Sequence, residues 1–424
     1  VEPRMERVGR LLELLGDPQR SYRVIHITGT NGKTSTSRMI ESLLRAHDLR
    51  TGLFTSPHLE RFTERIMIDG APISDAAVAD AWDELVPLVH LVDAELVGDA
   101  QAPLTFFEVL TALAFVACAD APVDVLVLEV GMGGAWDSTN AADGDIAVFT
   151  PIDIDHADRL GSTVAEIAAV KAGIIKDGAA VVSARQTDAA AAVLREHAAA
   201  RGASIAFEGD AFAVESAVLA VGGQMLTVRG LAARYADEYL PQYGRHQAHN
   251  AALAIAAVES FIGGGAQPIP GDILSEGLAT ATSPGRLQLV GVSPTVLVDA
   301  AHNPHGARAL AAAIGEFFDF DEWALVLGVF DDKNAAGIVD ALAPVVSRVF
   351  TTEPASPRAS DAETLADLVE AHGIAVSAHP APDEAMELAR RWAAEGERRA
   401  VLIAGSIVLT GEAISFAESE GWKA

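Results

Sequence analysis

Length, composition and charge exclude several classes of protein before any motif is considered. With 424 residues, of which half are hydrophobic and 21% charged, the chain is long enough for two or three globular domains with ample core. A formal net charge of −29 makes nucleic acid and anionic membranes poor partners, so an anionic ligand must be held by local cations, metal ions and helix ends. The single cysteine, Cys118, excludes an internal disulfide. Together with a charged N-terminal stretch and no apolar run of membrane-spanning length, it leads us to expect a cytoplasmic protein.

A strand, a glycine turn and a helix are predicted within the first 50 residues, after an amphipathic helix over residues 4–15. Residues 22–27 are apolar and β-branched, as in a buried strand. Residues 35–46 repeat apolar side chains with the period of a helix. The tight turn between these two elements is Gly29-Thr30-Asn31-Gly32-Lys33-Thr34.

This turn has the chemistry of a phosphate site. Backbone N–H groups and the positive end of the helix macrodipole attract an anion. Lys33 adds a positive charge for β- and γ-phosphates, and the Thr34 hydroxyl can help order a phosphate–metal cluster. The spacing departs from the strict P-loop pattern, because the first glycine would fall at Ile27. The strand–turn–helix context nevertheless favours a phosphate site over a chance Gly-Lys pair.

Two polar side chains follow predicted strands farther along the chain. Residues 51–54 form a short strand that leads into Thr55-Ser-Pro-His-Leu59, where Ser56 precedes a proline and is expected to be extended. This stretch by itself fits an ordinary Ser-Pro turn. Residues 124–129 form an apolar strand with Glu129 at its carboxyl end, and an acid there fits either a Mg²⁺ ligand or a solvated side chain. The run Gly131-Met-Gly-Gly134 leaves little bulk near Glu129, which indicates close approach of a ligand.

A histidine and a lysine follow the next predicted strand, residues 146–150. His156 lies at the same end of the sheet as Glu129 if both strands are parallel, so a packed histidine and a metal ligand fit about equally. A helix from Thr163 to Ala172 begins with a capping box that Glu166 completes. Lys171 of this helix sits in an apolar run, and the sequence alone favours an amine that extends to water. If the amine were buried instead, its pKa would fall, and a neutral amine can take up CO₂ as a carbamate.

The second half of the chain changes its pattern after a glycine–proline turn. Asn250 lies in the first turns of an alanine-rich helix predicted from 244 to about 261, where its amide can read a base edge. We place a domain boundary at the turn Ser283-Pro-Gly-Arg286, which gives domains 1–285 and 286–424. An arginine at a hinge, such as Arg286, can reach a phosphate.

Strands and helices alternate in the second domain. Other elements of the first domain are a strand at 64–68 and helices at 74–92, 104–117 and 189–200. The second domain has strands at 296–299, 323–327, 348–352 and 400–404 and helices at 305–317, 334–342, 361–372 and 383–395. The predicted fold is therefore α/β: a P-loop-type ATP-binding domain with a parallel-rich sheet, plus a smaller doubly wound, Rossmann-like C-terminal domain. The second domain lacks a glycine fingerprint, so we expect it to complete a site begun in the first.

Ten motifs, in order along the chain, resemble the folylpolyglutamate synthase/dihydrofolate synthase group of the Mur ligase family. They are Gly29-Thr-Asn-Gly-Lys33, Thr55-Ser-Pro-His-Leu59, Thr105-Phe-Phe-Glu108, Glu129-Val-Gly-Met-Gly-Gly134, Asp137-Ser-Thr-Asn140, Asp155-His156, Lys171-Ala-Gly-Ile174, His246-Gln-Ala-His-Asn250, Pro284-Gly-Arg286 and Asp299-Ala-Ala-His-Asn-Pro304. The last 110 or so residues match mainly in pattern. One departure is Ala135, because the family usually has a basic residue there, which leaves a substrate contact at that position open.

The resemblance implies a role for each matching residue. The implied ATP-binding residues are Gly29, Thr30, Asn31, Gly32, Lys33, Thr34, Ser35, Asn250, Arg286 and Asp299. The implied metal ligands are Ser56, Glu129 and His156, and the implied pteroate-binding residues are Thr105, Phe106, Phe107, Glu108, Trp136 and Asp137. Lys33, Lys171 and His302 are the implied catalytic residues, with Lys171 carbamylated and His302 a guess for the base.

The same resemblance implies an ATP-dependent ligase. It would add L-glutamate to dihydropteroate or a reduced folate through an acyl phosphate, with ATP and two Mg²⁺ ions, as a monomer. A cell-wall Mur ligase is the first alternative, but it carries an extra domain before the phosphate loop, whereas only 28 residues precede Gly29 here. A P-loop switch or transport ATPase is the second, and it would need neither Lys171 nor a second α/β domain with Asp299-Ala-Ala-His302. A non-catalytic structural protein would not keep so many polar groups at strand ends.

Overall fold

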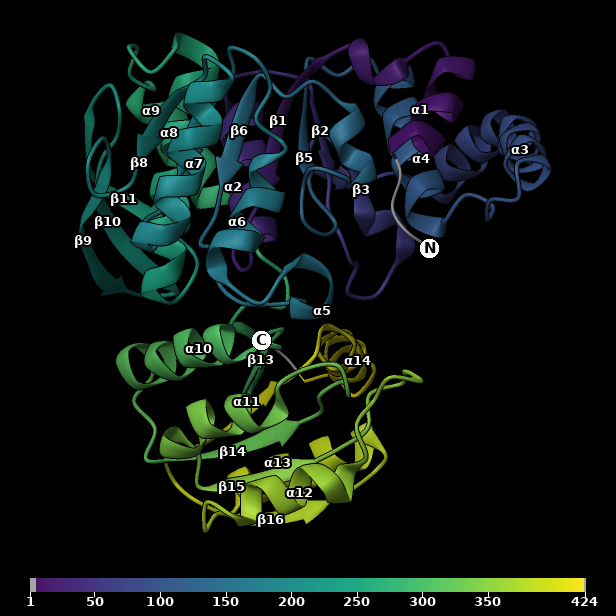
Figure 1. The fold of residues 1–424 in the computed structure, drawn as a ribbon. Coiled ribbons are helices and arrows are strands. Elements are labelled where there is room, and N and C mark those ends of the chain that lie inside the picture. The colour runs from purple at the N-terminus through teal and green to yellow at the C-terminus, as the bar shows by residue number, and fades with distance from the viewer. Residues whose placement is uncertain (1–4, 423–424) are drawn as a thin grey trace. The chain divides into compact units, whose positions relative to one another are not determined.

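The computed structural model describes residues 5–422, which form two compact units (Figure 1). The first unit comprises residues up to 220, 224–241 and 247–282, and the second comprises 221–223, 242–246 and the chain from 283 onward. Both units are α/β with parallel-rich sheets, so the predicted fold class is confirmed. Within residues 5–422, no helix is long and apolar enough to cross a membrane.

An eight-stranded sheet is the centre of the first unit, in the order β4-β3-β2-β5-β1-β6-β7-β8. The six strands from β2 to β8 in this order are parallel, and β3 and β4 continue the sheet antiparallel at one edge. The strands are β1 (Arg23–Thr28), β2 (Thr51–Phe54), β3 (Ile66–Ile68), β4 (Ala71–Pro72), β5 (Val125–Glu129), β6 (Ile146–Phe149), β7 (Ala180–Ser183) and β8 (Ser204–Phe207).

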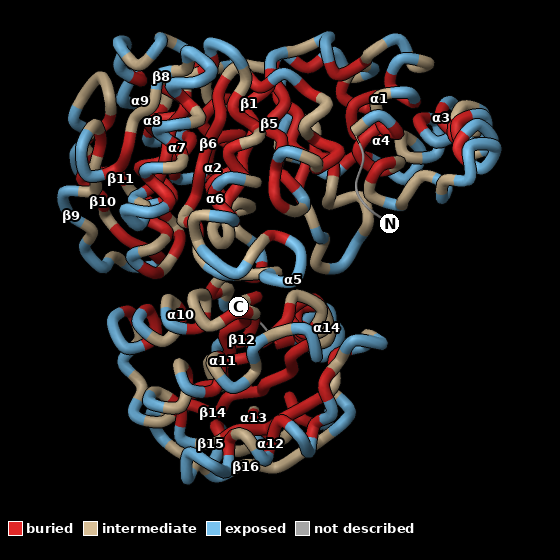
Figure 2. Tube along the Cα trace, viewed as in Figure 1, coloured by how far each residue is buried: buried red, intermediate tan, exposed pale blue. Residues whose placement is uncertain are grey.

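Helices cover both faces of this sheet, as a buried parallel sheet requires. They are α1 (Met5–Leu14), α2 (Lys33–Ala46), α3 (Asp75–Gly98), α4 (Phe106–Asp120), α5 (Ala157–Leu160), α6 (Val164–Ala172), α7 (Asp188–Ala200), α8 (Arg245–Gly263) and α9 (Gly271–Thr280). A three-stranded sheet in the order β11-β10-β9 completes the unit, with β9 (Ala213–Ala220), β10 (Gly223–Arg229) and β11 (Arg234–Leu240). Figure 2 shows the strands of the main sheet buried beneath their helices.

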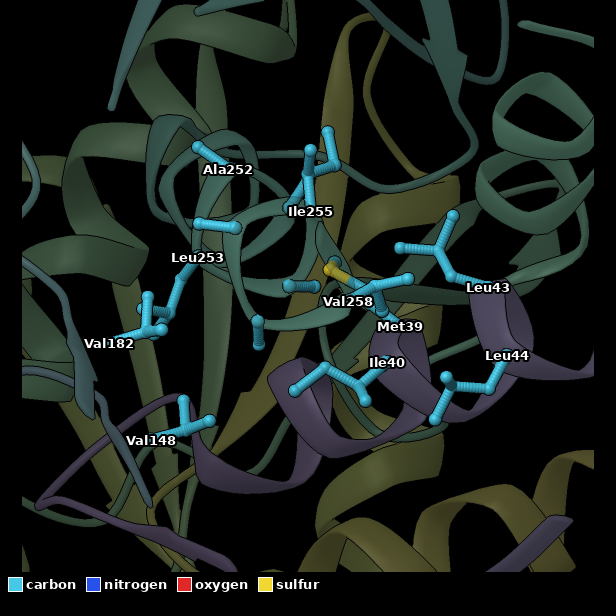
Figure 3. Packing of buried hydrophobic residues seen from close by; sticks show 14 of the residues in the cluster. Met39, Ile40, Leu43, Leu44, Val148, Val182, Ala252, Leu253, Ile255 and Val258 are labelled. Atoms are coloured by element: carbon cyan, nitrogen blue, oxygen red, sulfur yellow. The ribbon is translucent and has the colours of Figure 1, made fainter. Parts of the chain in front are cut away.

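Successive residues of each central strand contribute to different cores, because side chains alternate between the faces of a sheet. In β1, Ile25 and Ile27 pack with α2, α8 and α9, while Val24 packs with α1, α3 and α4. In β6, Val148 joins the first of these cores, and Phe149 packs with α6 and α7. Figure 3 shows the first core, with labelled side chains from α2, α8, β6 and β7: Met39, Ile40, Leu43, Leu44, Ala252, Leu253, Ile255, Val258, Val148 and Val182. Each large apolar side chain buried there contributes about 1.5–3 kcal/mol.

The strand order creates a switch point at the carboxyl end of β1. The chain leaves β1 through α2 toward β2 on one side, whereas β6, β7 and β8 follow one another on the other side. Open α/β sheets bind ligands in the crevice at such a point. The loop after β1 lies there.

The second unit is built on a six-stranded sheet in the order β12-β13-β17-β14-β15-β16, in which only β12 is antiparallel to its neighbour. The strands are β12 (Gln288–Val292), β13 (Thr295–Asp299), β14 (Glu322–Leu327), β15 (Arg348–Thr351), β16 (Ala375–Ala378) and β17 (Arg399–Ala404). The helices are α10 (Pro304–Phe317), α11 (Ala335–Leu342), α12 (Ala362–Glu370), α13 (Pro382–Ala394) and α14 (Ile407–Ser419).

Several element boundaries differ from the sequence expectations. α2 begins at Lys33, two residues earlier than predicted, because its first turn is polar and carries no apolar period. The predicted strand 64–68 is shorter, since residues 62–65 form a 3₁₀ turn, and α3 continues to Gly98 rather than ending at Val92. The sequence pattern gave no bounds for several elements, which are β4, β7 to β12, β16, α5, α9 and α14.

Candidate active site

Two glycines give the loop between β1 and α2 its shape. Gly29 has φ 152°, and a Cβ there would lie 1.9 Å from the hydroxyl oxygen of Thr150 at the end of β6. Gly32 has φ 86°, in the left-handed region, and a Cβ there would lie 2.8 Å from Oδ1 of Asn250. Any residue with a Cβ at these positions would push the loop away from Thr150 or Asn250.

The first turn of α2 has the features of an anion site. Its N-cap is Gly32, no side chain caps it, and its first turn holds no acidic residue. The N–H groups of this turn are therefore left for a ligand. Lys33 folds back over the loop, where its Nζ donates to the carbonyls of Gly29 and Thr30, 3.3 Å away in each case. The ammonium group thus lies at the loop itself.

Glu129 and Thr34 bring a carboxylate and a hydroxyl together beside this loop. In the parallel pairing of β1 with β5, Glu129 is opposite Ile27, so it lies at the same edge of the sheet as the loop. Thr34 Oγ1 donates to the carboxylate at 3.0 and 3.1 Å from its two oxygens, and Glu129 is only 1% exposed. Oxygen donors of this kind are the ligands that Mg²⁺ prefers, so these two side chains fit the ion.

Lys171 approaches the same loop from α6. Its Nζ donates to the carbonyl oxygen of Gly29 at 2.7 Å, and the residue is 4% exposed. The expectation that this amine extends to water is wrong, because the loop carbonyl provides a partner inside the protein. Burial, and next the charge of Lys33, lower the pKa of Lys171 to about 7, while Asp155 and Asp137 oppose the shift. At neutral pH a large fraction of this amine is uncharged.

The other predicted metal ligands are Ser56 and His156. His156 has φ 50°, its backbone N–H donates to Asp155 Oδ1 at 2.9 Å, and its Nε2 lies 4.0 Å from the same oxygen. Ser56 is partly buried at the end of β2. Between residues 5 and 422, no group of three or more histidines, cysteines or carboxylates is placed to hold a metal ion. The set Ser56, Glu129 and His156 therefore stays a prediction.

Asn250 lies beside the phosphate loop, and its Nδ2 donates to Gln247 Oε1 at 3.0 Å. Gln247, which the sequence analysis did not single out, donates at 3.4 Å to the hydroxyl of Ser35 in α2. All three side chains are buried. They fix the start of α8 against the start of α2. The only sequence signal for Gln247 was its place inside the motif that ends at Asn250.

Of the predicted pteroate-binding residues at the start of α4, some hold the structure together and one is exposed. Glu108 completes a capping box with Thr105 and forms a buried ion pair with Arg7 of α1, so its carboxylate stabilises the helix start. Phe107 packs against Phe54. Phe106, by contrast, is 64% exposed, which is unusual for phenylalanine.

The loop after β5 is held by its own side chains. Asp137 is buried and accepts hydrogen bonds from Met132 N and from the N–H and hydroxyl of Thr139, and burial raises its pKa despite them. Trp136 packs near Gly133. Asp137 thus shapes the loop. Of the two residues predicted here to bind the pteroate, Trp136 has the side chain that remains for that contact.

The glycines after Glu129 make room for protein atoms. A Cβ at Gly131 would lie 2.4 Å from the ring of Phe107, and one at Gly134 would lie 2.7 Å from the carbonyl oxygen of Lys171. These contacts explain why both positions are glycine, and the close approach of a ligand at this run stays a prediction.

Comparisons with known proteins agree with this architecture. Residues 27–258 match the Mur ligase middle domain, and residues 285–407 match the Mur ligase glutamate ligase domain. The first match alone covers more than half of the chain. The chain belongs to the Mur ligase family.

Within the Mur ligase family, the similar proteins carry folate-related names. A Mycobacterium tuberculosis protein named dihydrofolate synthase/folylpolyglutamate synthase is 47% identical over 97% of this chain and 90% of its own length. A Halobacterium salinarum protein named probable bifunctional folylpolyglutamate synthase/dihydropteroate synthase is 36% identical over 97% of this chain, which spans about half (49%) of that protein. A solved structure of M. tuberculosis folylpolyglutamate synthase, described as complexed with ADP and AMPPCP, has a TM-score of 0.94 at 47% identity and covers 98% of this chain and 95% of its own. These relatives favour the folate group over the cell-wall Mur ligases.

The Mur ligase glutamate ligase domain holds the three remaining predicted residues. Asp299 ends β13 and accepts hydrogen bonds from the N–H groups of Leu287 and Ala301, at 2.9 and 2.8 Å. Burial raises its pKa, and Arg286 opposes that shift. His302 Nδ1 lies 2.8 Å from the carbonyl oxygen of Ala300. The nucleotide contacts of Arg286 and Asp299 and the catalytic role of His302 stay predictions.

Proposed function

We propose that this chain is an ATP-dependent ligase that adds L-glutamate to the carboxylate of a pteroate or folate and releases ADP and phosphate. Support comes from the 47% identity, over nearly the whole chain, to a protein named dihydrofolate synthase/folylpolyglutamate synthase. The observation that carries the chemistry is the uncapped start of α2, with Lys33 over the loop and the Thr34–Glu129 pair beside it.

The reaction needs activation because a carboxylate is a poor acylating agent. Transfer of the γ-phosphoryl group of ATP to the carboxylate gives an acyl phosphate and ADP. The amine of glutamate then attacks the acyl carbon, and the carbon–oxygen bond to phosphate breaks. Lys33 and the N–H groups of α2 would bind the phosphate oxygens and offset their negative charge. Mg²⁺ would supply further positive charge, held by Thr34 and Glu129 together with the predicted ligands Ser56 and His156.

A carbamate on Lys171 is part of this proposal. The uncharged amine would attack CO₂, form a carbon–nitrogen bond and release one proton, which turns a potential cation into an anion. Burial of Lys171 and its lowered pKa support the step. Mass spectrometry of intact protein and ¹³C NMR in ¹³C-bicarbonate should show one carbamate that is lost in Lys171→Met. An unmodified amine at saturating bicarbonate would rule the carbamate out.

The remaining functional assignments follow the family resemblance. Functional domains 1–285 and 286–424 would supply the phosphate loop and the residues Arg286, Asp299 and His302, respectively. The protein would act as a monomer in the cytoplasm.

The direct test is product analysis with purified protein. ATP, Mg²⁺ and L-glutamate are supplied with dihydropteroate, tetrahydrofolate or a UDP-linked muropeptide in separate reactions, and ADP and product mass are followed. We expect ADP release that requires both glutamate and a pteridine acceptor, with a product heavier by one glutamyl residue. ADP release without acceptor would favour a simple ATPase, and activity with only the muropeptide would favour a cell-wall ligase.

A further inference from the structure

Four side chains near the start of α4 form a small surface, which we call the aromatic corner: His58, Phe62, Arg65 and Phe106. Phe62 meets Phe106 edge to face at 6.3 Å between ring centroids, and His58 meets Phe62 at 6.5 Å. The guanidinium carbon of Arg65 lies 5.6 Å from the centroid of Phe106. The corner therefore joins an exposed aromatic ring to a cation.

Arg65 is held in place without a carboxylate partner. Its Nε donates to Nδ1 of His58 at 2.8 Å, which fixes the guanidinium and makes Nδ1 the acceptor. None of the ion pairs formed among residues 5–422 includes Arg65. The neighbouring Glu64 directs its carboxylate to the backbone N–H groups of residues 59–61.

The environment of this guanidinium favours an anionic ligand. Burial lowers the pKa of Arg65, with only Glu64 opposing, so the charge is partly removed from water and not neutralised by a contact. The chain has 59 acidic and 30 basic residues, so carboxylates that could pair with Arg65 are plentiful. None of those in the described residues contacts it. A planar guanidinium with free terminal N–H groups matches a carboxylate.

The backbone places Arg65 beside the candidate active site. The N–H of Thr55 donates to the Arg65 carbonyl at 3.0 Å, and Thr55 immediately precedes Ser56. Phe106 is one of the predicted pteroate-binding residues, so the corner borders the surface where the aromatic ring of the substrate is expected. A folate acceptor brings an aromatic ring and two glutamyl carboxylates, of which one reacts. In a protein with a net charge of −29, the second needs its own cation.

We propose that Arg65 binds the non-reacting α-carboxylate of a folate acceptor while Phe106 and Phe62 contact its aromatic ring, so that Arg65 determines preference for acceptors that already carry glutamate. This inference rests on the proposed ligase function, and it gives roles to Arg65 and Phe62, which neither the family motifs nor the comparisons assign. Dihydropteroate lacks that carboxylate and would gain nothing from Arg65.

The test compares tetrahydrofolate with its α-carboxamide analogue, which removes the charge and keeps the shape. Values of kcat/KM are measured for wild type, Arg65→Met, Arg65→Lys and the control Arg61→Met, which removes an exposed arginine from the same loop. We expect wild type and Arg61→Met to prefer the carboxylate by about tenfold or more. In Arg65→Met the preference should fall to within about twofold, and Arg65→Lys should keep part of it. For Arg65→Met, kcat/KM with dihydropteroate and KM for ATP should each change by less than about threefold.

An unchanged preference in Arg65→Met, or no preference in wild type, would overturn the assignment. If Arg65→Met does not fold, the wild-type preference and the Arg65→Lys result decide. Binding of the two folates, followed by protein fluorescence, separates this inference from the proposed function. An Arg65-dependent preference without product formation would reject the ligase and keep the subsite, whereas product formation without the preference would do the reverse.

Discussion

The two units differ in how the first turn of a helix is capped, as a comparison of α2 with α10 shows. Both helices follow a strand of the main sheet of their unit, β1 and β13. In α10, the side chain of Asn303 accepts from the N–H of Gly306 at 2.8 Å, and Pro304 occupies the first turn. In α2, the cap is Gly32, with no side chain over the first turn. One helix start is closed by its own residues, and the other is open to a phosphate.

The acids at the strand ends differ in the same way. Asp299 after β13 accepts from two backbone N–H groups and so holds the loop around it. Glu129 at the end of β5 instead pairs with the hydroxyl of Thr34, the second residue of the open helix. The two acids thus differ in their local partners: Asp299 accepts from backbone N–H groups of its own loop, and Glu129 accepts from a side chain of the open helix.

The largest expected effect comes from Lys33→Ala, which removes the charge at the open helix start. We expect kcat for ligation to fall by about 10²–10³-fold or more, because the transferring phosphoryl group loses a cation. Steady-state ADP release measures it. Lys176→Ala is the control, since Lys176 also donates to a carbonyl, that of Asn140, but lies away from the loop. Near-normal turnover in Lys33→Ala would contradict the site.

Glu129→Gln tests the strand-end acid at the open site. Replacing a carboxylate by an amide should raise the Mg²⁺ concentration for half-maximal activity by about tenfold or more. Magnesium titrations at fixed ATP measure the shift. Asp124→Asn, just before the other end of β5, should leave the requirement unchanged, because Asp124 accepts from the backbone of Arg50. Equal shifts in both variants would remove the metal role from Glu129.

Gly32→Ala separates backbone strain from contact at the loop. The new Cβ would meet Asn250, and we expect KM for ATP to rise about tenfold. Gly178→Ala is a matched control, since Gly178 has φ 72° with no atom within 4 Å of the added Cβ. Both variants should lose about 1 kcal/mol of stability in thermal unfolding, but only Gly32→Ala should weaken ATP binding. If KM for ATP were the same in Gly32→Ala as in Gly178→Ala, the loop would tolerate a side chain at position 32.

The smallest effect is expected at the closed helix. Asn303→Ala should lower the free energy of unfolding by about 1 kcal/mol, as loss of a cap does, and Asn334→Ala at the start of α11 should match it. Denaturant unfolding measures both. The change in KM for ATP in Asn303→Ala should be smaller than in Gly32→Ala, and a larger one would make α10 a phosphate site as well.

Local pattern was sufficient to predict the phosphate loop, the buried strands and the acid at the end of β5. The β-branched run before Gly29, and the apolar residues before Glu129, identify strands whose carboxyl ends lie at one edge of a parallel sheet. The capping box of Thr163 and Glu166 was also predicted correctly, because all its atoms lie within four residues.

The missed features depend on partners far along the chain. Lys171 is buried because its amine reaches Gly29, 142 positions away, and Glu108 is used by Arg7, 101 positions away. Phe107 lies against Gly131 from 24 positions earlier in the chain, so that a Cβ at Gly131 would meet its ring. No local periodicity carries such information.

The central position of β1 has a consequence for synthesis. This strand is translated early, yet both of its neighbours, β5 and β6, come from residues 125–149, and Gly29 packs against Thr150. The strand and the loop after it cannot reach their packed positions until at least about the first third of the polypeptide has left the ribosome. Until then the strand's unpaired edges are open to aggregation or to capture by a chaperone.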